Sequence, residues 1–436
     1  MTQWRRLIAL MGIAALLLIL TVIGLLQQQR DHIAFVLVAL VQGALYLIAV
    51  WLILRGELPR RAVAAILGIA VLLRLTILFT SPFLSDDIFR YIWDGRVEAH
   101  GINPYRYVPV DPHLEDLQDA TIFPNVNRST YAPTIYPPIA EAIFLAVTRI
   151  SESLTWMKAA MVMFEAVAIF VILRTLARDA LPLSRILIYA WHPLTFWEFS
   201  GSGHIDAAIV TFVALALRAR QRHVPSLVGV AVACATLVKF FPAVILPALY
   251  RRWDWKMPTA FLALVFLAYL PFLGVGTSVF GFLPQYVAEE GMTTGGGFYL
   301  WNLLKAALGL EDLGVLPYVI FAMAVMAALG LHVLFAPLDD GRHAARALLL
   351  ASALTVLVSP HYPWYFAWLV TFLCFVPSAP MLYLTVASVL LYLIPGGPNL
   401  VPNGYRLMVE SAVYGPALVC ALALYRRPAW AAGVGR

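Results

Sequence analysis

The chain has 436 residues, of which 62% are hydrophobic and only 12% are charged. A soluble domain carries about 25% charged residues, so this composition excludes an ordinary soluble enzyme and, with a mean hydropathy of +0.83, indicates a polytopic membrane protein. The net charge of +6 comes from short Lys and Arg clusters between apolar stretches, a membrane pattern that gives no reason to expect a nucleic-acid partner.

The apolar stretches lack the alternating ten-residue pattern of membrane β-strands. We therefore predict an all-α, polytopic integral membrane helix bundle of about 12–14 spans, forming one domain over residues 1–436. The expected spans and short apolar helices, in chain order, are 7–26, 33–54, 62–80, 157–172, 186–199, 205–217, 227–238, 241–250, 261–272, 315–333, 348–358, 366–376, 383–394 and 408–425.

Basic residues predict the orientation. Arg5 and Arg6 precede the first span, and later Arg and Lys clusters recur on the same side of the expected topology. If these clusters face the cytoplasm, both termini are cytoplasmic. The long polar segment 81–155, which follows additional N-terminal spans at 1–61, is then extracytoplasmic.

This polar segment opens with two adjacent carboxylates, Asp86 and Asp87, directly after an apolar helix. Charged groups at the mouth of a span are costly and often functional. Short helices are expected at 87–100, lying along the membrane, and at 137–148. One acid could cap the first of these helices, but Ser85 could cap it equally well, so the pair leaves one acid available for chemistry.

Three further polar motifs are expected on the same side: Gly-His-Ile-Asp around His204, Lys-Phe-Phe-Pro at Lys239, and Ser-Pro-His-Tyr around His361. Each has a structural alternative, namely a tight capped turn, a lysine that snorkels to the interface, and an aromatic belt that includes Tyr362. An aromatic belt does not account for His361, which we expect to contact a ligand.

Glu165 is the acid placed most deeply within a span, and we expect it to pair with another polar group of the bundle. Cys234, Cys374 and Cys420 lie in apolar stretches and are interpreted as packing residues, so no metal site is expected. The sequence has no glycine-rich phosphate loop, which disfavours a nucleotide substrate.

Taken together, these motifs resemble the C-type (GT-C) membrane glycosyltransferase superfamily, in particular the bacterial polyprenyl-phosphomannose-dependent mannosyltransferases. The resemblance covers roughly 62–365. Besides the motifs above, it is carried by the segment from Ser85 to Arg96 and by the short motifs Asn103-Pro104-Tyr105 and Tyr136-Pro137-Pro138. It implies a GT-C-like helical enzyme of the bacterial cytoplasmic (inner) membrane, with its active site on the extracytoplasmic side.

The resemblance also implies site residues. An Asp at the start of the first large outer loop is the acceptor-activating base in such families, and this role falls on Asp87, with Asp86 as the second candidate because the two acids are adjacent here. A basic or His residue is expected near the donor phosphate. The residues expected to bind the donor phosphate or substrate are His361, Lys239, His204, Arg90, Tyr136 and Tyr362.

The chemistry follows from general principles. A sugar hydroxyl is a poor nucleophile, so a carboxylate must take its proton during attack. A lipid phosphate leaves as a stable anion and needs cations rather than a general acid, so neither a metal nor another cofactor is expected. One displacement inverts the anomeric carbon.

We therefore predict an inverting hexosyltransferase, most simply a mannosyltransferase, that uses a polyprenyl-phosphate sugar and a glycolipid or polysaccharide acceptor. The alternative is a flippase for a polyprenyl-linked sugar or lipid, which would bind with the same basic and aromatic residues. A transporter more naturally places its charges at the bilayer midplane between repeated halves. This sequence shows no such repeat.

Overall fold

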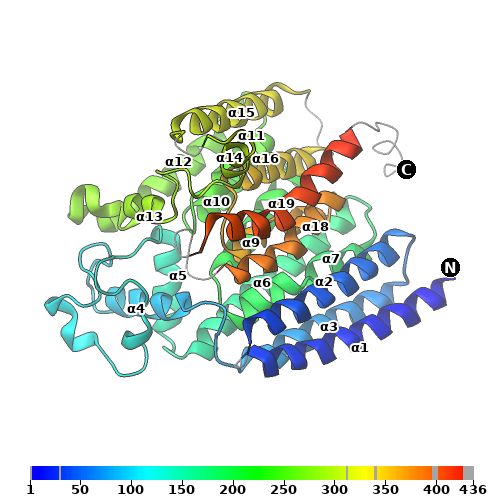
Figure 1. Cartoon of the computed structure of the whole chain (residues 1–436), viewed down its shortest axis with the longest axis horizontal. Coiled ribbons are helices and arrows are strands. Elements are labelled where there is room, and N and C mark those ends of the chain that lie inside the picture. The colour runs from blue at the N-terminus through cyan, green and yellow to red at the C-terminus, as the bar shows by residue number, and fades with distance from the viewer. Residues whose placement is uncertain (1, 29–30, 311–312, 338–340, 395–400, 426–436) are drawn as a thin grey trace.

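The computed structural model describes residues 2–28, 31–310, 313–337, 341–394 and 401–425, and these residues are helical or irregular, with no strand among them (Figure 1). In this described part, seven helical segments are long and apolar enough to cross a membrane. They are α1 (Gln3–Gln28), α2 (His32–Leu54), α3 (Arg60–Leu78), α6 (Leu154–Arg178), the run Lys256–Glu289, α15 (Leu316–Phe335) and α19 (Asn403–Tyr425). The chain is therefore a multi-pass helical membrane protein, as its composition predicts.

Helices α1, α2 and α3 pack together along one side of the bundle (Figure 1). Tyr46 and Leu73 point inward and are buried, whereas large apolar side chains such as Ile8 and Trp51 are at least half exposed, as expected for surfaces that face lipid. The start of α1 and the end of α19 lie at one end of the view, and the loop around α4 lies at the other.

Helix α3 ends at Leu78, eight residues before Asp86, and Lys158 of α6 caps this end. The Lys158 ammonium donates to the carbonyl oxygen of Thr80 at 2.6 Å and to that of Ile77 at 3.2 Å. A cation at a helix C-terminus satisfies exposed carbonyls and complements the helix dipole. This contact fixes the chain where it leaves the bundle for the polar segment.

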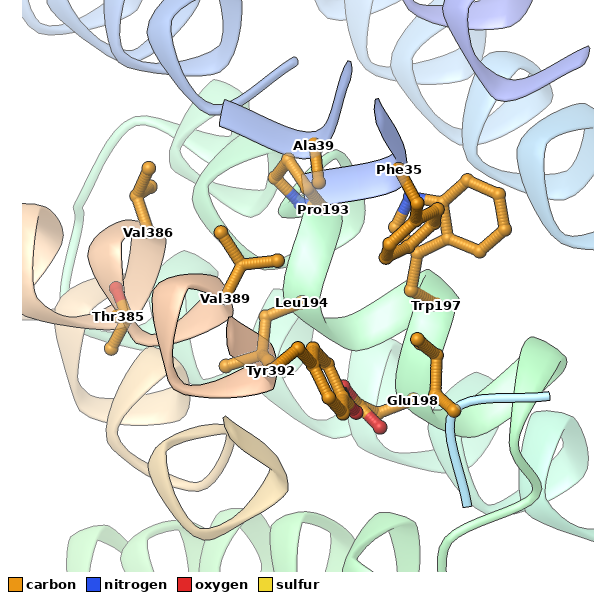
Figure 2. Close-up of a pocket in the computed structure, with 11 residues that line it drawn as sticks. Phe35, Ala39, Pro193, Leu194, Trp197, Glu198, Thr385, Val386, Val389 and Tyr392 are labelled. Carbon is orange, nitrogen blue, oxygen red and sulfur yellow. Dashed lines mark hydrogen bonds between the residues drawn. The ribbon is translucent and has the colours of Figure 1, made fainter. Parts of the chain in front are cut away.

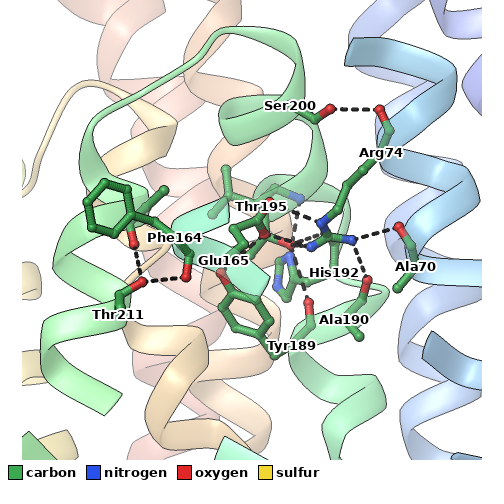
Figure 3. A network of polar contacts seen from close by, with 12 residues as sticks. Ala70, Arg74, Phe164, Glu165, Tyr189, Ala190, His192, Thr195, Ser200 and Thr211 are labelled. Atoms are coloured by element: carbon green, nitrogen blue, oxygen red, sulfur yellow. Dashed lines mark hydrogen bonds and ion pairs between the residues drawn. The ribbon is translucent and has the colours of Figure 1, made fainter. Parts of the chain in front are cut away.

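The centre of the bundle contains a buried ion pair (Figure 3). The Arg74 guanidinium donates to both carboxylate oxygens of Glu165, at 2.6 and 3.0 Å, and the Tyr189 hydroxyl donates to the same carboxylate at 3.2 Å. Arg74 also donates to the Ala190 carbonyl at 2.9 Å. The expectation that Glu165 pairs within the bundle is confirmed, and the pair links α3 to α6.

The helix expected at 186–199 is broken. Helices α7 (Leu187–Ala190) and α8 (Pro193–Thr195) are separated at His192, and a π-helical turn, η4 (Phe196–Gly201), follows. The break arises because Pro193 has no N–H to donate and the His192 ring accepts the N–H of Leu194 at 3.2 Å.

The polar segment forms a packed unit around α4 (Asp87–Ala99) and α5 (Pro138–Thr148), with short turns η1 (Pro112–Leu117) and η2 (Phe123–Asn125) between them. Helices α4 and α5 approach closely at Gly95, where a Cβ atom would lie 2.6 Å from the Phe144 carbonyl oxygen. Both the apolar face of α4 and its polar side chains Arg90, Asp94 and Arg96 are buried. Helix α4 is therefore an internal helix of this unit.

Several later predictions need correction. Residues 276–298, which no expected span covers, contain the end of a 3-10 helix and a further helix, and short helices replace the spans expected at 366–376 and 383–394. Between the last two expected spans, residues 395–400 lie outside the described residues, and α19 begins at Asn403 rather than at the expected position 408. The remaining elements are η3 (Leu183–Ile186), α9 (Asp206–Gln221), α10 (Pro225–Thr236), η5 (Phe241–Ile245), α11 (Leu246–Leu249), α12 (Lys256–Tyr269), η6 (Leu270–Phe280), α13 (Leu283–Glu289), α14 (Tyr299–Leu308), α16 (His343–Val358), η7 (Pro363–Phe366), α17 (Leu369–Leu373), α18 (Ala379–Ala387) and η8 (Ser388–Leu393).

Candidate active site

A cavity of about 710 Å³ lies where the polar segment meets α13, the end of α16 and η7. This volume is within the range of about 300–1,000 Å³ that is usual for ligand sites. Seven of the eight predicted site residues line it: Asp86, Asp87, Arg90, Tyr136, Lys239, His361 and Tyr362. The fold thus gathers side chains that are almost 280 positions apart in the sequence into one pocket, while their roles stay predictions.

The acid pair is held by Asn127 from the loop between α4 and α5. The Asn127 amide nitrogen donates to Asp87 Oδ1 at 2.8 Å and to Asp86 Oδ1 at 3.1 Å. The Ser85 hydroxyl, in turn, accepts the backbone N–H of Asp87 at 3.2 Å, while Asp86 occupies the N-cap position of α4 without a side-chain cap hydrogen bond. Asp86 is exposed, whereas the Asp87 side chain is only 19% exposed, so Asp87 is the acid set into the protein wall.

Burial raises the pKa of Asp87 to about 6, and the neighbouring Asp86 carboxylate contributes to this rise. The nearby charges of Lys239 and Arg128 and the hydrogen bond from Asn127 act in the opposite direction. At neutral pH Asp87 is therefore mostly ionised and yet more basic than an ordinary Asp. These are the properties required of a general base.

Lys239 lines the cavity, and its positive charge is paired with the carboxylate of Asp206. Its Nζ lies 2.6 Å from Oδ2 of Asp206, which is almost fully buried, and 4.5 Å from the ring centroid of Tyr365. The ion pair and the aromatic face hold the ammonium group at the cavity wall.

Arg90 lines the cavity, but its guanidinium is bonded to other groups of the protein. Its Nε lies 2.8 and 2.9 Å from the two carboxylate oxygens of Asp94, and its Nη1 donates to the Ala132 carbonyl at 3.1 Å. These bonds hold the irregular segment 132–137 beside the cavity. The neighbouring Tyr136 carbonyl accepts the Tyr105 hydroxyl at 2.6 Å, which joins the Asn-Pro-Tyr and Tyr-Pro-Pro motifs.

His361 lies beside an ion pair that the sequence reasoning missed. Arg406 and Glu410, one turn apart on α19, are 2.9 Å from each other. The Arg406 guanidinium is 3.2 Å from Nδ1 of His361, and Glu410 Oε1 is 3.7 Å from the same nitrogen. One signal was present in the sequence, because an Arg on the predicted outer side is an exception to the charge rule.

Arg128 was also missed. Its guanidinium is 3.0 Å from Oε2 of Glu289 on α13 and 5.5 Å from the ring centroid of Tyr286. Arg128 lines the cavity and brings a third cationic side chain to it, after Arg90 and Lys239. Arg128 also lies on the predicted outer side, but it is one of five Arg residues in the segment 81–155, so its position did not single it out.

The structure places His204 behind the cavity lining, in the turn between η4 and α9. Its side chain is fully buried, with Nδ1 at 3.9 Å from Asp87 Oδ2 and at 3.4 Å from the Tyr91 hydroxyl. The turn needs Gly203, whose φ is +77° and where a Cβ atom would lie 2.7 Å from Ile88. His204 therefore faces the candidate base, although the sequence predicted that it would bind substrate.

Aromatic rings connect His204 to the cavity. The His204 ring stacks on Trp364 with centroids 4.0 Å apart, and Trp364 stacks on Tyr362 at 4.6 Å. The Tyr362 and Trp364 rings belong to the cavity lining. The aromatic residues near His361 are thus packed into the site, with Trp364 stacked on both His204 and Tyr362.

A second pocket, of about 20 Å³, lies deeper between α2, η4 and η8 (Figure 2). Its lining is mostly apolar and includes Glu198, whose Oε1 accepts the Tyr392 hydroxyl at 2.6 Å. The space is sufficient for about one water molecule. Among the described residues, no group of three His, Cys, Asp or Glu side chains is arranged to hold a metal ion.

Comparison with known protein families gives one match. Residues 6–254 match the family described as alpha-(1->6)-mannopyranosyltransferase, N-terminal domain. The matched range includes the acid pair, Asn127, Arg128, His204 and Lys239, whereas His361, Tyr362 and Trp364 follow it. Comparison with curated proteins and with solved structures gives no match.

Proposed function

The chain belongs to the alpha-(1->6)-mannopyranosyltransferase family, and on this premise we propose that it transfers a mannosyl residue from a polyprenyl-phosphate donor to a hydroxyl group of a glycolipid or polysaccharide acceptor. The observation that carries the proposal is the position of Asp87, a partly buried carboxylate of raised pKa in the wall of a cavity that also presents cations.

In the proposed reaction, Asp87 takes the proton of the acceptor hydroxyl while the hydroxyl oxygen attacks the anomeric carbon. The new carbon–oxygen bond forms as the bond from that carbon to the phosphate oxygen breaks, and the electron pair leaves with the phosphate. A single displacement inverts the configuration, so a β-linked donor gives an α-linked product.

The leaving phosphate requires positive charge, and Lys239, Arg128 and the His361–Arg406 pair supply it in our proposal. The cavity also has apolar lining from Leu354 and Val358 of α16, which suits the start of a polyprenyl chain. In this scheme the protein's own cations stabilise the leaving group, and no divalent metal is required.

The proposal includes the orientation of the protein in a bacterial cytoplasmic membrane. The basic clusters support cytoplasmic termini and an extracytoplasmic active site. Single cysteines introduced at the exposed positions Glu115 and Arg222 test this orientation with a membrane-impermeant maleimide. We expect labelling of intact cells at Glu115→Cys and labelling at Arg222→Cys only after the membrane is opened, and the reverse pattern contradicts the orientation.

The central experiment measures mannose transfer by the full-length protein in liposomes, with polyprenyl-phosphomannose as donor. We expect Asp87→Asn to lower kcat by about 10²–10⁴-fold while donor binding is kept, because proton transfer of this kind contributes about that factor. Asp86→Asn should cost less than about tenfold. The exposed acid Glu115, changed to Gln, is the matched control and should leave turnover unchanged.

Three results are distinguishable. If Asp86→Asn alone abolishes turnover, the base is Asp86. If neither substitution changes turnover, neither acid is the base and the proposed mechanism is wrong. If the wild type consumes no donor but moves labelled lipid across the bilayer, the protein acts as a transporter and the proposed reaction is wrong.

A further inference from the structure

Glu290 is a carboxylic acid of the cavity that the proposed reaction does not use. It lines the cavity together with Asp87 and His361, and the residue is only 4% exposed. A carboxylate has about four acceptor positions, and in the described part of the chain the Tyr286 hydroxyl donates to this one. Because buried polar groups are normally paired, the remaining acceptor positions are suited to polar groups of a ligand.

The backbone fixes the position of Glu290. Helix α13 ends at Glu289, and residues 291–297 then fold back over this end. The N–H of Gly297 donates to the Gly291 carbonyl at 2.9 Å, and a Cβ atom at Gly297 would lie 2.4 Å from the Glu290 carbonyl oxygen. Only glycine fits this approach, so the glycine-rich stretch closes over Glu290 and holds the backbone from which its side chain reaches the cavity.

The hydroxyl of Tyr362 places Glu290 relative to the candidate base. Burial raises the pKa of this hydroxyl, and the carboxylates of Glu290 and Asp87 both add to the rise, so the two acids lie near the same ring. The charge of His361, in turn, acts on Glu290. Glu290 is therefore close both to the cavity wall beside the base and to a side chain proposed to hold the donor phosphate.

The chemistry of the donor restricts which group can meet Glu290. The mannosyl group is bonded to the phosphate, so its ring lies next to the cations that hold that phosphate. Its anomeric carbon must also come within about 3–3.5 Å of the acceptor hydroxyl that gives its proton to Asp87. The ring of the donor sugar consequently lies between His361 and Asp87, where Glu290 presents its carboxyl group.

We propose that Glu290 forms a hydrogen bond with a hydroxyl group of the donor's mannosyl residue and thereby selects the hexose that is transferred. This inference rests on the proposed transfer reaction and deepens it. No covalent bond forms or breaks at Glu290. The adjacent acid, Glu289, is already engaged, because its two carboxylate oxygens accept the Nε–H of Arg128 at 3.1 and 3.0 Å.

The proposed contact does not depend on the charge of Glu290. Burial raises the pKa of Glu290, whereas the charge of His361 and the hydrogen bond from Tyr286 act in the opposite direction. An ionised carboxylate accepts hydrogen bonds from sugar hydroxyls, and a protonated carboxyl group both donates to them and accepts from them. A site that hydrogen-bonds a substrate hydroxyl rejects analogues that lack it, because the protein group is then left unpaired.

The test measures donor binding to the full-length protein in lipid nanodiscs, which requires no acceptor. The probes are polyprenyl-phosphomannose and analogues that each lack one hydroxyl group of the mannosyl ring. The wild type should bind at least one analogue about 10–100-fold more weakly than the parent donor, as expected for the loss of a hydrogen bond to a charged group. Glu290→Ala should bind that analogue and the parent donor with dissociation constants within about threefold of each other.

Two further variants separate hydroxyl recognition from a general effect of charge. Glu289→Gln changes the neighbouring acid of the cavity lining, so it should weaken the binding of every donor by the same factor and keep the wild-type discrimination. Glu290→Asp keeps the charge near His361 but is shorter by one methylene group, and it should lose discrimination. If Glu290→Ala does not fold, Glu290→Asp answers the same question.

Three outcomes overturn the inference. The first is a wild type that binds every analogue as tightly as the parent donor, and the second is a Glu290→Ala variant with the same ratios between donors as the wild type. The third is an equal loss for every donor in Glu290→Ala that Glu290→Asp restores, which would make Glu290 a counter-charge for His361. A wild type that does not bind polyprenyl-phosphomannose overturns the proposed function instead.

Discussion

The Nζ of Lys239 lies 2.6 Å from Oδ2 of Asp206, which joins the Lys-Phe-Phe-Pro motif to the Gly-His-Ile-Asp motif 33 residues earlier. The Asp206 side chain is only 2% exposed, so its charge depends on this partner. Two short motifs that are separate in sequence are thus one electrostatic unit at the cavity wall. Any experiment on Lys239 must separate its contribution to the fold from its contribution to binding.

A double variant makes this separation. Lys239→Met leaves Asp206 buried without its partner and should destabilise the protein by about 3–5 kcal/mol. Lys239→Met combined with Asp206→Asn should recover most of that loss in thermal unfolding in detergent. If Lys239 binds the donor phosphate, the double variant still shows a donor KM raised at least tenfold. A wild-type KM in the double variant would restrict Lys239 to a structural role.

The pH dependence of transfer should follow Asp87. Its folded-state pKa is raised to about 6, and only the ionised form accepts a proton, so kcat/KM should rise as the pH increases through about 6 and then level off. Because the pKa of Asp87 is higher in the folded state than in the unfolded chain, ionisation of Asp87 destabilises the fold. The free energy of unfolding should therefore decrease as the pH rises through about 6. Asp87→Asn should therefore be inactive and at least as thermostable as the wild type at pH 7. A variant that unfolds earlier would contradict this account.

Substitution of Asn127 offers an independent test of the role of the Asp87 carboxylate. Its amide donates to Asp87 and Asp86, so Asn127→Asp replaces a donor by a third carboxylate. Like charges raise a carboxyl pKa, and the rising limb of the pH profile should move up by about one pH unit. Asn127→Ala, which only removes the donor, should move it less. Profiles that coincide with the wild type in both variants would show that Asn127 does not act on the base.

The Arg74–Glu165 pair should be essential for stability and not for chemistry. Arg74→Met or Glu165→Met strands one buried charge, which typically costs about 3–5 kcal/mol, whereas the double Met variant should be closer to the wild type because no charge remains unpaired. Thermal unfolding in detergent measures both effects. The fraction of each variant that remains folded should transfer mannose with wild-type kcat. A lower kcat would connect this ion pair to the active site.

Chelation tests the cation scheme. If the protein's own Lys, Arg and His side chains stabilise the leaving phosphate, transfer should persist after dialysis against EDTA. A loss of activity that added magnesium or manganese restores would show that a divalent metal takes part.

Much of the fold could be predicted, because spans of uniform hydropathy have a length set by the bilayer. The expected span 33–54 is close to α2, and the expected helix 87–100 almost coincides with α4. The break at His192 was not predicted, since its neighbours are apolar throughout and only Pro193 marks it. Helix α14 was also missed, because it follows directly on a glycine-rich stretch that reads as loop.

The candidate site was predictable in its residues more than in its geometry. Polar residues in apolar surroundings stand out, which is why Asp87, Lys239 and His361 were identified. Sequence position does not reveal which way a side chain faces, so His204 was expected to contact substrate although Trp364 stacks on it and Asp87 lies in front of it. Arg406 meets His361 only because α19 packs beside η7, a relation between segments 45 residues apart.

The pairing of Arg74 with Glu165 also has a consequence for how the protein is made. The two residues are 91 positions apart, so the third span emerges from the ribosome well before the helix that neutralises its charge. At about 5–20 residues per second, Arg74 waits roughly 5–18 s for its partner. Arg74 lies in the last third of α3 (Arg60–Leu78), and an unpaired Arg inside a span opposes membrane insertion. We therefore expect α3 to be held firmly in the bilayer, and the polar segment after it to dock, only once α6 has been synthesised.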